Sequence, residues 1–213
     1  MSSPAASDPT PGAAGPRERF AVPVRKMVGL GLALVLLAGC DDKQVLVPAE
    51  PLPSASVQAP NSADLLFADM MVVHHAQAVR MSKSLIAKPG VTERPRLIAE
   101  FIAHDQQREI DETNAWLVAW GRPAADPADP VIAQLHSGGG HGMVAEKKLQ
   151  AAEKAAAPEA TRLFLTLMIE HHAGMVTMAR AVLKDGANVY IHGLAKHIIN
   201  EQTSEISAMQ ALL

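Results

Sequence analysis

Apolar residues recur every three or four positions through four long segments of this 213-residue chain, which is the spacing of one face of an α-helix. In the first segment, one such stripe contains Phe67, Met71, His74, Ala78 and Met81. Capping residues at the starts of the segments, and Pro or Gly at their ends, set the limits of the helices. The expected helices run from 61 or 62 to before 89, from about 92 to 120, from 158 to 185, and from about 188 to 212.

The first and third of these helices are copies of one another. Residues 67–81 align with residues 164–178 at an offset of 97, and Phe, Met, His, His, Ala and Met recur in both. The second and fourth helices match at an offset of 96, in the pairs Ala99/Ala195, Ile102/Ile198, Gln106/Gln202, Glu109/Glu205 and Ile110/Ile206. Neither helical hairpin can bury its apolar face alone. The duplication therefore predicts an all-α four-helix bundle with approximate twofold symmetry.

The domain organisation follows from the repeat. Repeat one is expected over residues 61–120 and repeat two over residues 158–213, joined by a long crossover over 121–157. The crossover contains a Pro-rich turn, a Gly-rich stretch and the pattern of a short helix near 144–156.

Residues 1–39 have the pattern of a secretory leader. A basic stretch precedes an apolar run over 27–37 that is too short for a stable membrane span. Leu-Ala-Gly and then Cys40 follow, which resembles the lipobox of bacterial lipoproteins. An uncleaved signal anchor with an incidental cysteine is the alternative. The interpretation is an exported protein, held by lipid on Cys40 at the periplasmic face or the cell surface of a bacterium, with residues 40–60 as a Pro-rich tether.

Composition and charge narrow the class of protein. Hydrophobic residues make up 48% of the chain and aromatic residues only 3%, which favours a helical core. Loss of the leader removes four basic and two acidic side chains and changes the formal charge from −3 to −5. An acidic domain without basic clusters offers no positively charged surface to the phosphates of nucleic acid, so nucleic acid is excluded as a partner. The sequence identifies no protein partner.

The duplicated histidine pairs are the candidate metal ligands. Imidazole binds copper, zinc, nickel and iron, and the soft thioether of Met favours Cu(I). Outside the cytoplasm, His and Met can hold copper without cysteine. The candidate ligands at helical spacing are His74, His75, Met71 and Met81 in the first repeat, and His171, His172, Met168, Met175 and Met178 in the second.

The alternative is a purely structural role, in which Met fills the core and each His is a buried polar side chain with its hydrogen bonds made inside the protein. Burying imidazoles twice at matching positions is costly unless they are used, which favours metal binding. Polar residues of the other two helices are expected to accept the second ring N–H of a ligating His, namely Gln106, Glu109, Gln202 and Glu205. His136 and His141 lie in the Gly-rich stretch as an accessory pair, and His104, His192 and His197 are interpreted as surface or structural residues.

These motifs resemble the bacterial family catalogued as domain of unknown function 305. The pattern is Asp64, Phe67, Met71, His74, His75, Ala76 and Met81 in the first copy, and Phe164, Met168, His171, His172, Ala173, Gly174 and Met178 in the second. Gly142-Met143 and the two Gln-x-x-Glu-Ile segments also match. The resemblance implies a ferritin-like four-helix fold, often exported, and some relatives resemble periplasmic copper-binding proteins. Two positions depart from the family pattern: Thr161 replaces the second Asp, and Arg80 follows Ala78-Val79.

Three functions remain open at this point. The first is a copper-binding lipoprotein that sequesters or transfers the ion and needs no catalysis, with iron or zinc as other possible ions. The second is a ferritin-like di-iron oxidoreductase, although the chain contains no Glu-x-x-His. Bis-His haem is a variant of this second function without a covalent attachment motif. The third is a structural or interaction lipoprotein without metal.

Overall fold

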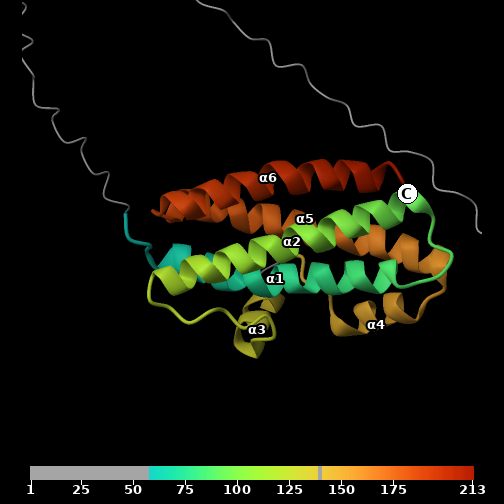
Figure 1. The fold of residues 1–213 in the computed structure, drawn as a ribbon, viewed down its shortest axis with the longest axis horizontal. Coiled ribbons are helices and arrows are strands. Elements are labelled where there is room, and N and C mark those ends of the chain that lie inside the picture. The colour runs from blue at the N-terminus through green and yellow to red at the C-terminus, as the bar shows by residue number, and fades with distance from the viewer. Residues whose placement is uncertain (1–57, 139–140) are drawn as a thin grey trace, which may run out of the picture. The chain divides into compact units, whose positions relative to one another are not determined.

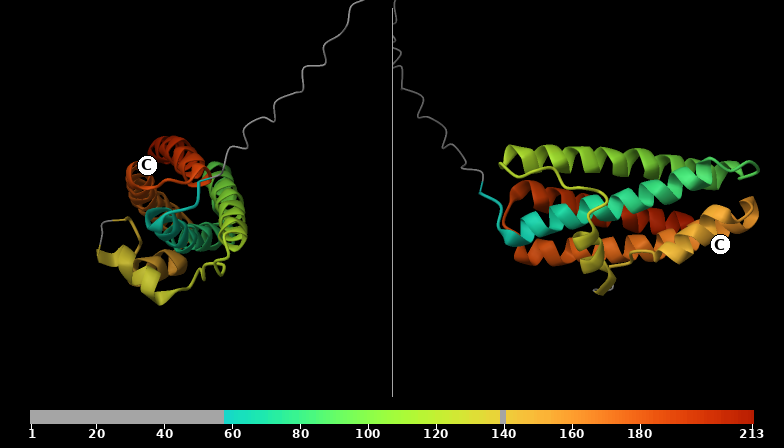
Figure 2. Two further views of the ribbon diagram at one scale, coloured as in Figure 1. Left: turned by 90° about the vertical axis from the view of Figure 1, so that its left-hand side faces the viewer. Right: turned by 90° about the horizontal axis from the view of Figure 1, so that it is seen from below.

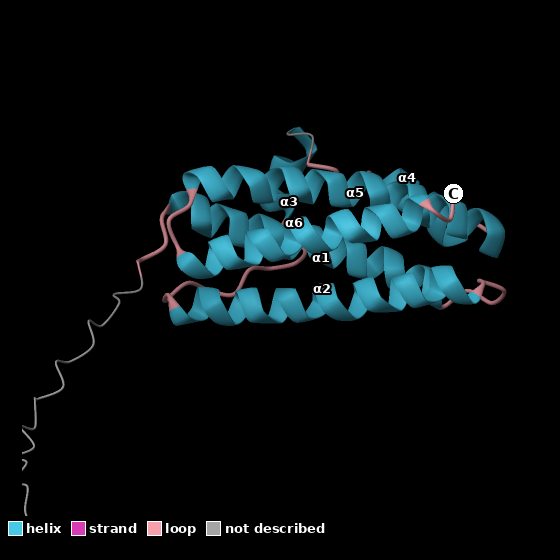
Figure 3. Cartoon of the chain, turned by 90° about the horizontal axis from the view of Figure 1, so that it is seen from above, coloured by secondary structure: helices cyan, strands magenta, loops and turns pink. Residues whose placement is uncertain are grey.

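The computed structural model describes residues 58–138 and 141–213. The predicted leader, Cys40 and most of the predicted tether lie outside the described residues. The described part consists of helices and the loops that connect them, and it contains no strand (Figure 3). None of its helices combines the length and the apolar character needed to cross a membrane. The helices are α1 (Ser62–Ile86), α2 (Glu93–Ala119), α3 (Pro130–Gly138), α4 (Glu146–Lys154), α5 (Ala157–Asp185) and α6 (Val189–Gln210).

Four long helices form the bundle. Helix α1 packs along α2, α5 packs along α6, and the two hairpins meet mainly through α1 and α5 (Figure 1). The short helices α3 and α4 lie outside the bundle on the side of α1 and α5 (Figure 2). The predicted all-α bundle of two duplicated hairpins is confirmed.

The helix limits agree with the capping signals, with one correction. Asn61 caps α1 through its side chain and forms a reciprocal capping box with Asp64. The predicted Pro-rich turn, however, continues into helix α3 at Pro130. Proline is compatible with a first helical turn, and the Asp129 side chain accepts hydrogen bonds from the amides of Val131 and Ile132. This proline therefore begins a helix instead of ending one.

Arg80 has a structural role that the sequence pattern did not reveal. Its guanidinium pairs with Glu146 at 2.8 Å and with Glu153 at 2.8 Å, both on α4. One of the two residues at which the chain departs from the pattern thus attaches α4 to α1.

Asp64 connects the start of α1 to the turn between α5 and α6. Its carboxylate is fully buried and accepts hydrogen bonds from the amides of Asn61 at 2.9 Å, Ala187 at 3.0 Å and Asn188 at 3.1 Å. Thr161 stands at the equivalent position of repeat two, and its hydroxyl donates to the carbonyl of Ala157 in its own helix. The two repeats are therefore not equivalent at this position.

We expect Asp64→Ala to lower the free energy of unfolding by about 2–3 kcal/mol, because three backbone amides lose a buried acceptor. Thr161→Ala is the matched control and is expected to change it by less than about 0.5 kcal/mol. Urea unfolding followed by circular dichroism measures both variants. Equal effects of the two substitutions would contradict this assignment.

Candidate metal centre

Two histidines from different repeats meet at the centre of the bundle. His74 of α1 and His171 of α5 are both fully buried, and their ring centroids lie 3.7 Å apart at an interplanar angle of 37°. Each is the first histidine of its His-His pair, so the duplication brings equivalent positions together across the interface of α1 and α5.

The crossover adds two more imidazoles. The ring of His136, in α3, is 5.4 Å from that of His74 and 5.6 Å from that of His141. His136 is only 2% exposed, and its Nε2 lies 3.0 Å from the carbonyl oxygen of Met70. His74 Nε2 donates to the carbonyl oxygen of His141 at 2.8 Å. Because α3 closes over α1, these residues belong to the central cluster and not to a loose accessory pair.

Glycines let the crossover reach α5. A Cβ atom at Gly174 would overlap the backbone of His141 and Gly142. Gly142 itself has φ +76°, a left-handed conformation that favours glycine, and a Cβ there would lie 2.5 Å from the carbonyl oxygen of Glu170. The position of His141 over the central cluster therefore depends on the absence of side chains at 142 and 174.

The histidine nitrogens of the centre have few partners. Neither nitrogen of His171 has a hydrogen-bond partner among the described residues, although the ring is fully buried. The buried Nδ1 atoms of five further histidines also lack a partner there: His74, His75, His136, His141 and His172. Buried polar atoms are normally paired, so this set fits a ligand that accepts imidazole lone pairs. A transition-metal ion is such a ligand.

Burial keeps the central imidazoles uncharged. Burial, and next the charge that His75 would carry, hold the pKa of His74 well below its usual range. Burial, and next the charge that His74 would carry, lower the pKa of His171 in the same way. Burial also lowers the pKa of His136. These rings are therefore neutral near pH 7, the form in which imidazole binds metals.

The second histidine of each pair has a carboxylate partner. His75 Nε2 lies 2.7 Å from an oxygen of Glu109, and His172 Nε2 lies 2.7 Å from an oxygen of Glu205. Each carboxylate accepts the Nε2–H and so fixes the orientation of the ring. Neither amide atom of Gln106 has a hydrogen-bond partner in the described part, and the same holds for Oε1 of Gln202.

The predicted methionines are all buried but do not gather in one place. Met71, Met175 and Met178 belong to one apolar cluster of the core. Met81 and Met168 belong to a second cluster with Leu85, Phe164 and Leu149 of α4.

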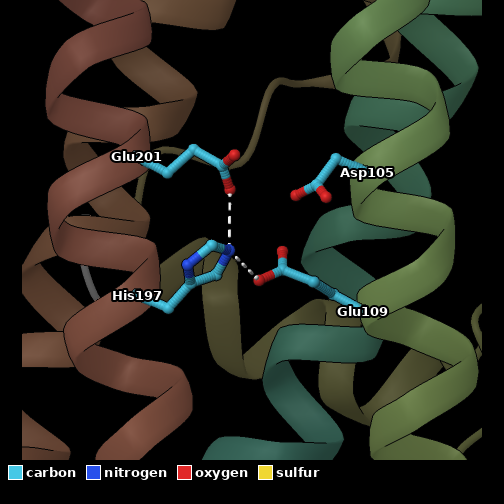
Figure 4. Close-up of side chains that lie close together, drawn as sticks. All are labelled: Asp105, Glu109, His197 and Glu201. Carbon is cyan, nitrogen blue, oxygen red and sulfur yellow. Dashed lines mark ion pairs between the residues drawn. The ribbon is translucent and has the colours of Figure 1, made fainter. Parts of the chain in front are cut away.

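A group of charged residues that the sequence interpretation did not bring together lies between α2 and α6 (Figure 4). It consists of Asp105, Glu109, His197 and Glu201. His197 Nε2 is 3.1 Å from Glu201 and 3.6 Å from Glu109, so the interpretation of His197 as a surface or structural residue missed this group. Asp105 and Glu201 are 96 residues apart, the offset of the matched glutamates, and extending the repeat to acidic pairs would have found them.

The carboxyl groups of this cluster influence each other. Burial, and next the hydrogen bond with Asp105 and the neighbouring carboxylates, raise the pKa of Glu201 to about 8. Burial opposes ionisation of Asp105, but hydrogen bonds with Arg108 and Glu201 outweigh it and lower the pKa of that carboxyl. Near pH 7 Asp105 is thus ionised while Glu201 holds a proton.

A duplicated four-helix bundle with a buried, histidine-rich centre, whose ring nitrogens mostly lack hydrogen-bond partners among the described residues, defines the class of this protein. Residues 64–213 match the sequence profile of the family described as domain of unknown function (DUF305). The chain belongs to this family.

Solved structures extend the comparison. The DUF305 fragment from Deinococcus radiodurans is 28% identical with a TM-score of 0.64, covering 73% of this chain and 97% of its own. A DUF305 protein from Streptomyces coelicolor, provisionally described as secreted, is 32% identical with a TM-score of 0.63, covering 71% and 92%. CopM in its Cu(I)-bound form is 26% identical with a TM-score of 0.56, covering 70% and 94%. No curated protein matches the chain.

Proposed function

We propose that this protein is an exported, lipid-anchored copper-binding protein that holds Cu(I) reversibly among the buried histidines of the bundle. The observation that carries the proposal is His171, a fully buried imidazole neither of whose nitrogens has a hydrogen-bond partner among the described residues. His74 faces it, and His136 and His141 lie beside His74. Such a centre is costly for folding alone and becomes favourable when a metal ion uses the free lone pairs.

The character of the centre favours a soft monovalent ion. The candidate ligands there are imidazoles, with buried thioethers in the same core and no carboxylate among them, and burying one positive charge costs less than burying two. Structures of CopM, which resembles this chain, contain Cu(I), Cu(II) or Ag. A soft-metal site in this chain agrees with that likeness.

A hollow beside the centre offers a route for the ion. It measures about 210 Å³ and is lined by His141 together with Met70 and Met178. Two thioethers next to a partly exposed imidazole can receive Cu(I) from a donor before it reaches the buried rings. Sequestration or transfer of the ion requires only reversible coordination and no catalysis.

The proposed location combines two observations. The first 39 residues have the pattern of a cleaved leader, and Cys40 follows at the position expected for the lipid. A relative that is 32% identical is provisionally described as secreted. In this proposal residues 40–60 are the tether that holds the bundle (61–213) at the membrane.

The test is titration of the purified protein with Cu(I) under anaerobic conditions against a chromophoric competing chelator. We expect about one tightly bound Cu(I), and we expect His171→Leu to weaken binding at least about 100-fold, since even changes behind a ligand cost 10–100-fold. His171 has no hydrogen bond to lose, so the variant should remain folded and be no less stable in the absence of metal.

The matched control is His104→Leu, which removes an exposed histidine of α2. Its Cu(I) affinity should equal that of the original protein. Unchanged affinity in His171→Leu, or no Cu(I) binding by the original protein, would refute the proposal.

A further inference from the structure

The charged cluster between α2 and α6 is separate from the central histidines. Asp105 and Glu109 come from α2, and His197 and Glu201 come from the facing turns of α6 (Figure 4). One oxygen or nitrogen from each of the four side chains lies within 4.8 Å of all the others. Helices α2 and α6 belong to different repeats and touch only slightly, so side chains and not close backbone packing occupy the space between them.

Glu109 provides an independent sign of a ligand. The residue is 1% exposed, and its Oε2 is held at 2.7 Å from His75. Its other oxygen, Oε1, is buried, points into the cluster and has no hydrogen-bond partner among the described residues (Figure 4). Within the cluster, His197 Nε2 lies 3.6 Å from that oxygen, beyond hydrogen-bond distance. A buried carboxylate oxygen without a donor is costly and fits a position where a cation binds.

Asp105 contributes a second buried oxygen. Arg108 engages Oδ1 of this carboxylate, and Oδ2 is buried without a close hydrogen bond. The Asp105 carboxylate is influenced by the proton on Glu201, which a bound cation would displace. The oxygens of Asp105 and Glu109 come from one face of α2, because the two residues are four positions apart. They face the His197–Glu201 pair, which has the same spacing on α6.

We propose that Asp105, Glu109, His197 and Glu201 form a binding site for a divalent first-row metal ion, such as Zn²⁺. Three carboxylates and one imidazole are a hard to borderline donor set, which suits Zn²⁺ or Mn²⁺ and not the soft Cu(I) of the central site. Four ligands about 2.0–2.2 Å from one ion lie about 3.5 Å from each other, so the side chains need only a small movement to close on it.

Access from solvent and the partial exposure of two side chains support this site. A hollow of about 330 Å³ between the two helices is lined by Glu109, His197 and Tyr190, so an ion can reach the cluster from solvent. The His197 side chain is 47% exposed and the Glu201 side chain 20%, which leaves both free to adjust. An ion bound to Glu109 Oε1 would also fix the carboxylate that orients His75, which links this site to the core.

The test is isothermal titration of the full chain with Zn²⁺, comparing the original protein with the double variant His197→Ala/Glu201→Gln. Both substituted residues lie partly exposed on α6, so the bundle should remain folded. We expect the double variant to lose one Zn²⁺ equivalent, or to bind it at least about 100-fold more weakly. Its affinity for Cu(I) should be unchanged.

Two comparisons make the result specific. Glu100→Gln/His104→Ala removes an acidic residue and a histidine at the same spacing from another, exposed face of α2, and should keep Zn²⁺ binding intact. His171→Leu should also keep it, even if the copper proposal fails. Equal Zn²⁺ binding by the original protein and the His197→Ala/Glu201→Gln variant, or no Zn²⁺ binding at all, would overturn the inference.

Discussion

Gly174→Ala is expected to destabilise the bundle by at least about 3 kcal/mol and to abolish the central site. A Cβ atom at this position meets the backbone of His141 and Gly142, which no change of side-chain rotamer can relieve. Forcing atoms into a packed contact typically costs 1–3 kcal/mol, and here the crossover must also leave α5. That movement removes the acceptor of His74, the carbonyl oxygen of His141, and displaces the Val144 backbone from Gln77.

Gly193→Ala is the matched control within the same protein. Gly193 also lies inside a long helix, α6, but a Cβ atom there meets nothing within 4 Å. Alanine favours helix over glycine by about 1 kcal/mol, so this variant should be slightly more stable than the original. Urea unfolding gives both free energies, and a Gly174→Ala variant as stable as Gly193→Ala would show that the crossover does not dock as described.

The second large effect is expected for Glu109→Leu, which should lower the free energy of unfolding by about 3–5 kcal/mol. Removing one member of a buried charge-assisted pair leaves the other without a partner. In Glu109→Leu, the donor left without an acceptor is the Nε2–H of His75, which is fully buried. Urea unfolding in the presence of a chelator measures the effect on the metal-free protein.

Two companion variants separate the hydrogen bond from packing. Glu109→Gln keeps an acceptor oxygen for His75 and should recover most of the lost stability. The pair His75→Leu/Glu109→Leu removes both polar partners and should be less destabilised than Glu109→Leu alone. Equal stability of Glu109→Leu and Glu109→Gln would show that the hydrogen bond to His75 contributes little.

The helices could be predicted because their signals are local. Asn61 and Asn188 cap α1 and α6, and an apolar stripe of period 3.6 runs along each long helix. The fold class followed from the duplication, since two similar amphipathic hairpins can bury their apolar faces against each other. Helix α3 was missed because Pro130 is a breaker inside a helix but a good residue in a first turn.

The candidate sites could be predicted only in part. The duplication in the sequence singles out His74 and His171, because a polar residue that recurs within an apolar stripe is costly to bury unless it is used. It could not show that His136 closes over His74, since their contact depends on where the crossover packs. The role of His197 could not be predicted from the sequence, because a single histidine on a polar helix face is usually a surface residue.

The helices, their pairing into two repeats and the four histidines of the duplicated motif follow from the amino-acid sequence alone, because each depends on periodicity within a short segment or on similarity between segments. Three-dimensional packing establishes which nitrogens lack partners, where Gly174 lets the crossover approach, and that Asp105 and Glu201 face each other. These features arise from contacts between residues distant in the chain, which the packing of the whole bundle determines and no local pattern encodes.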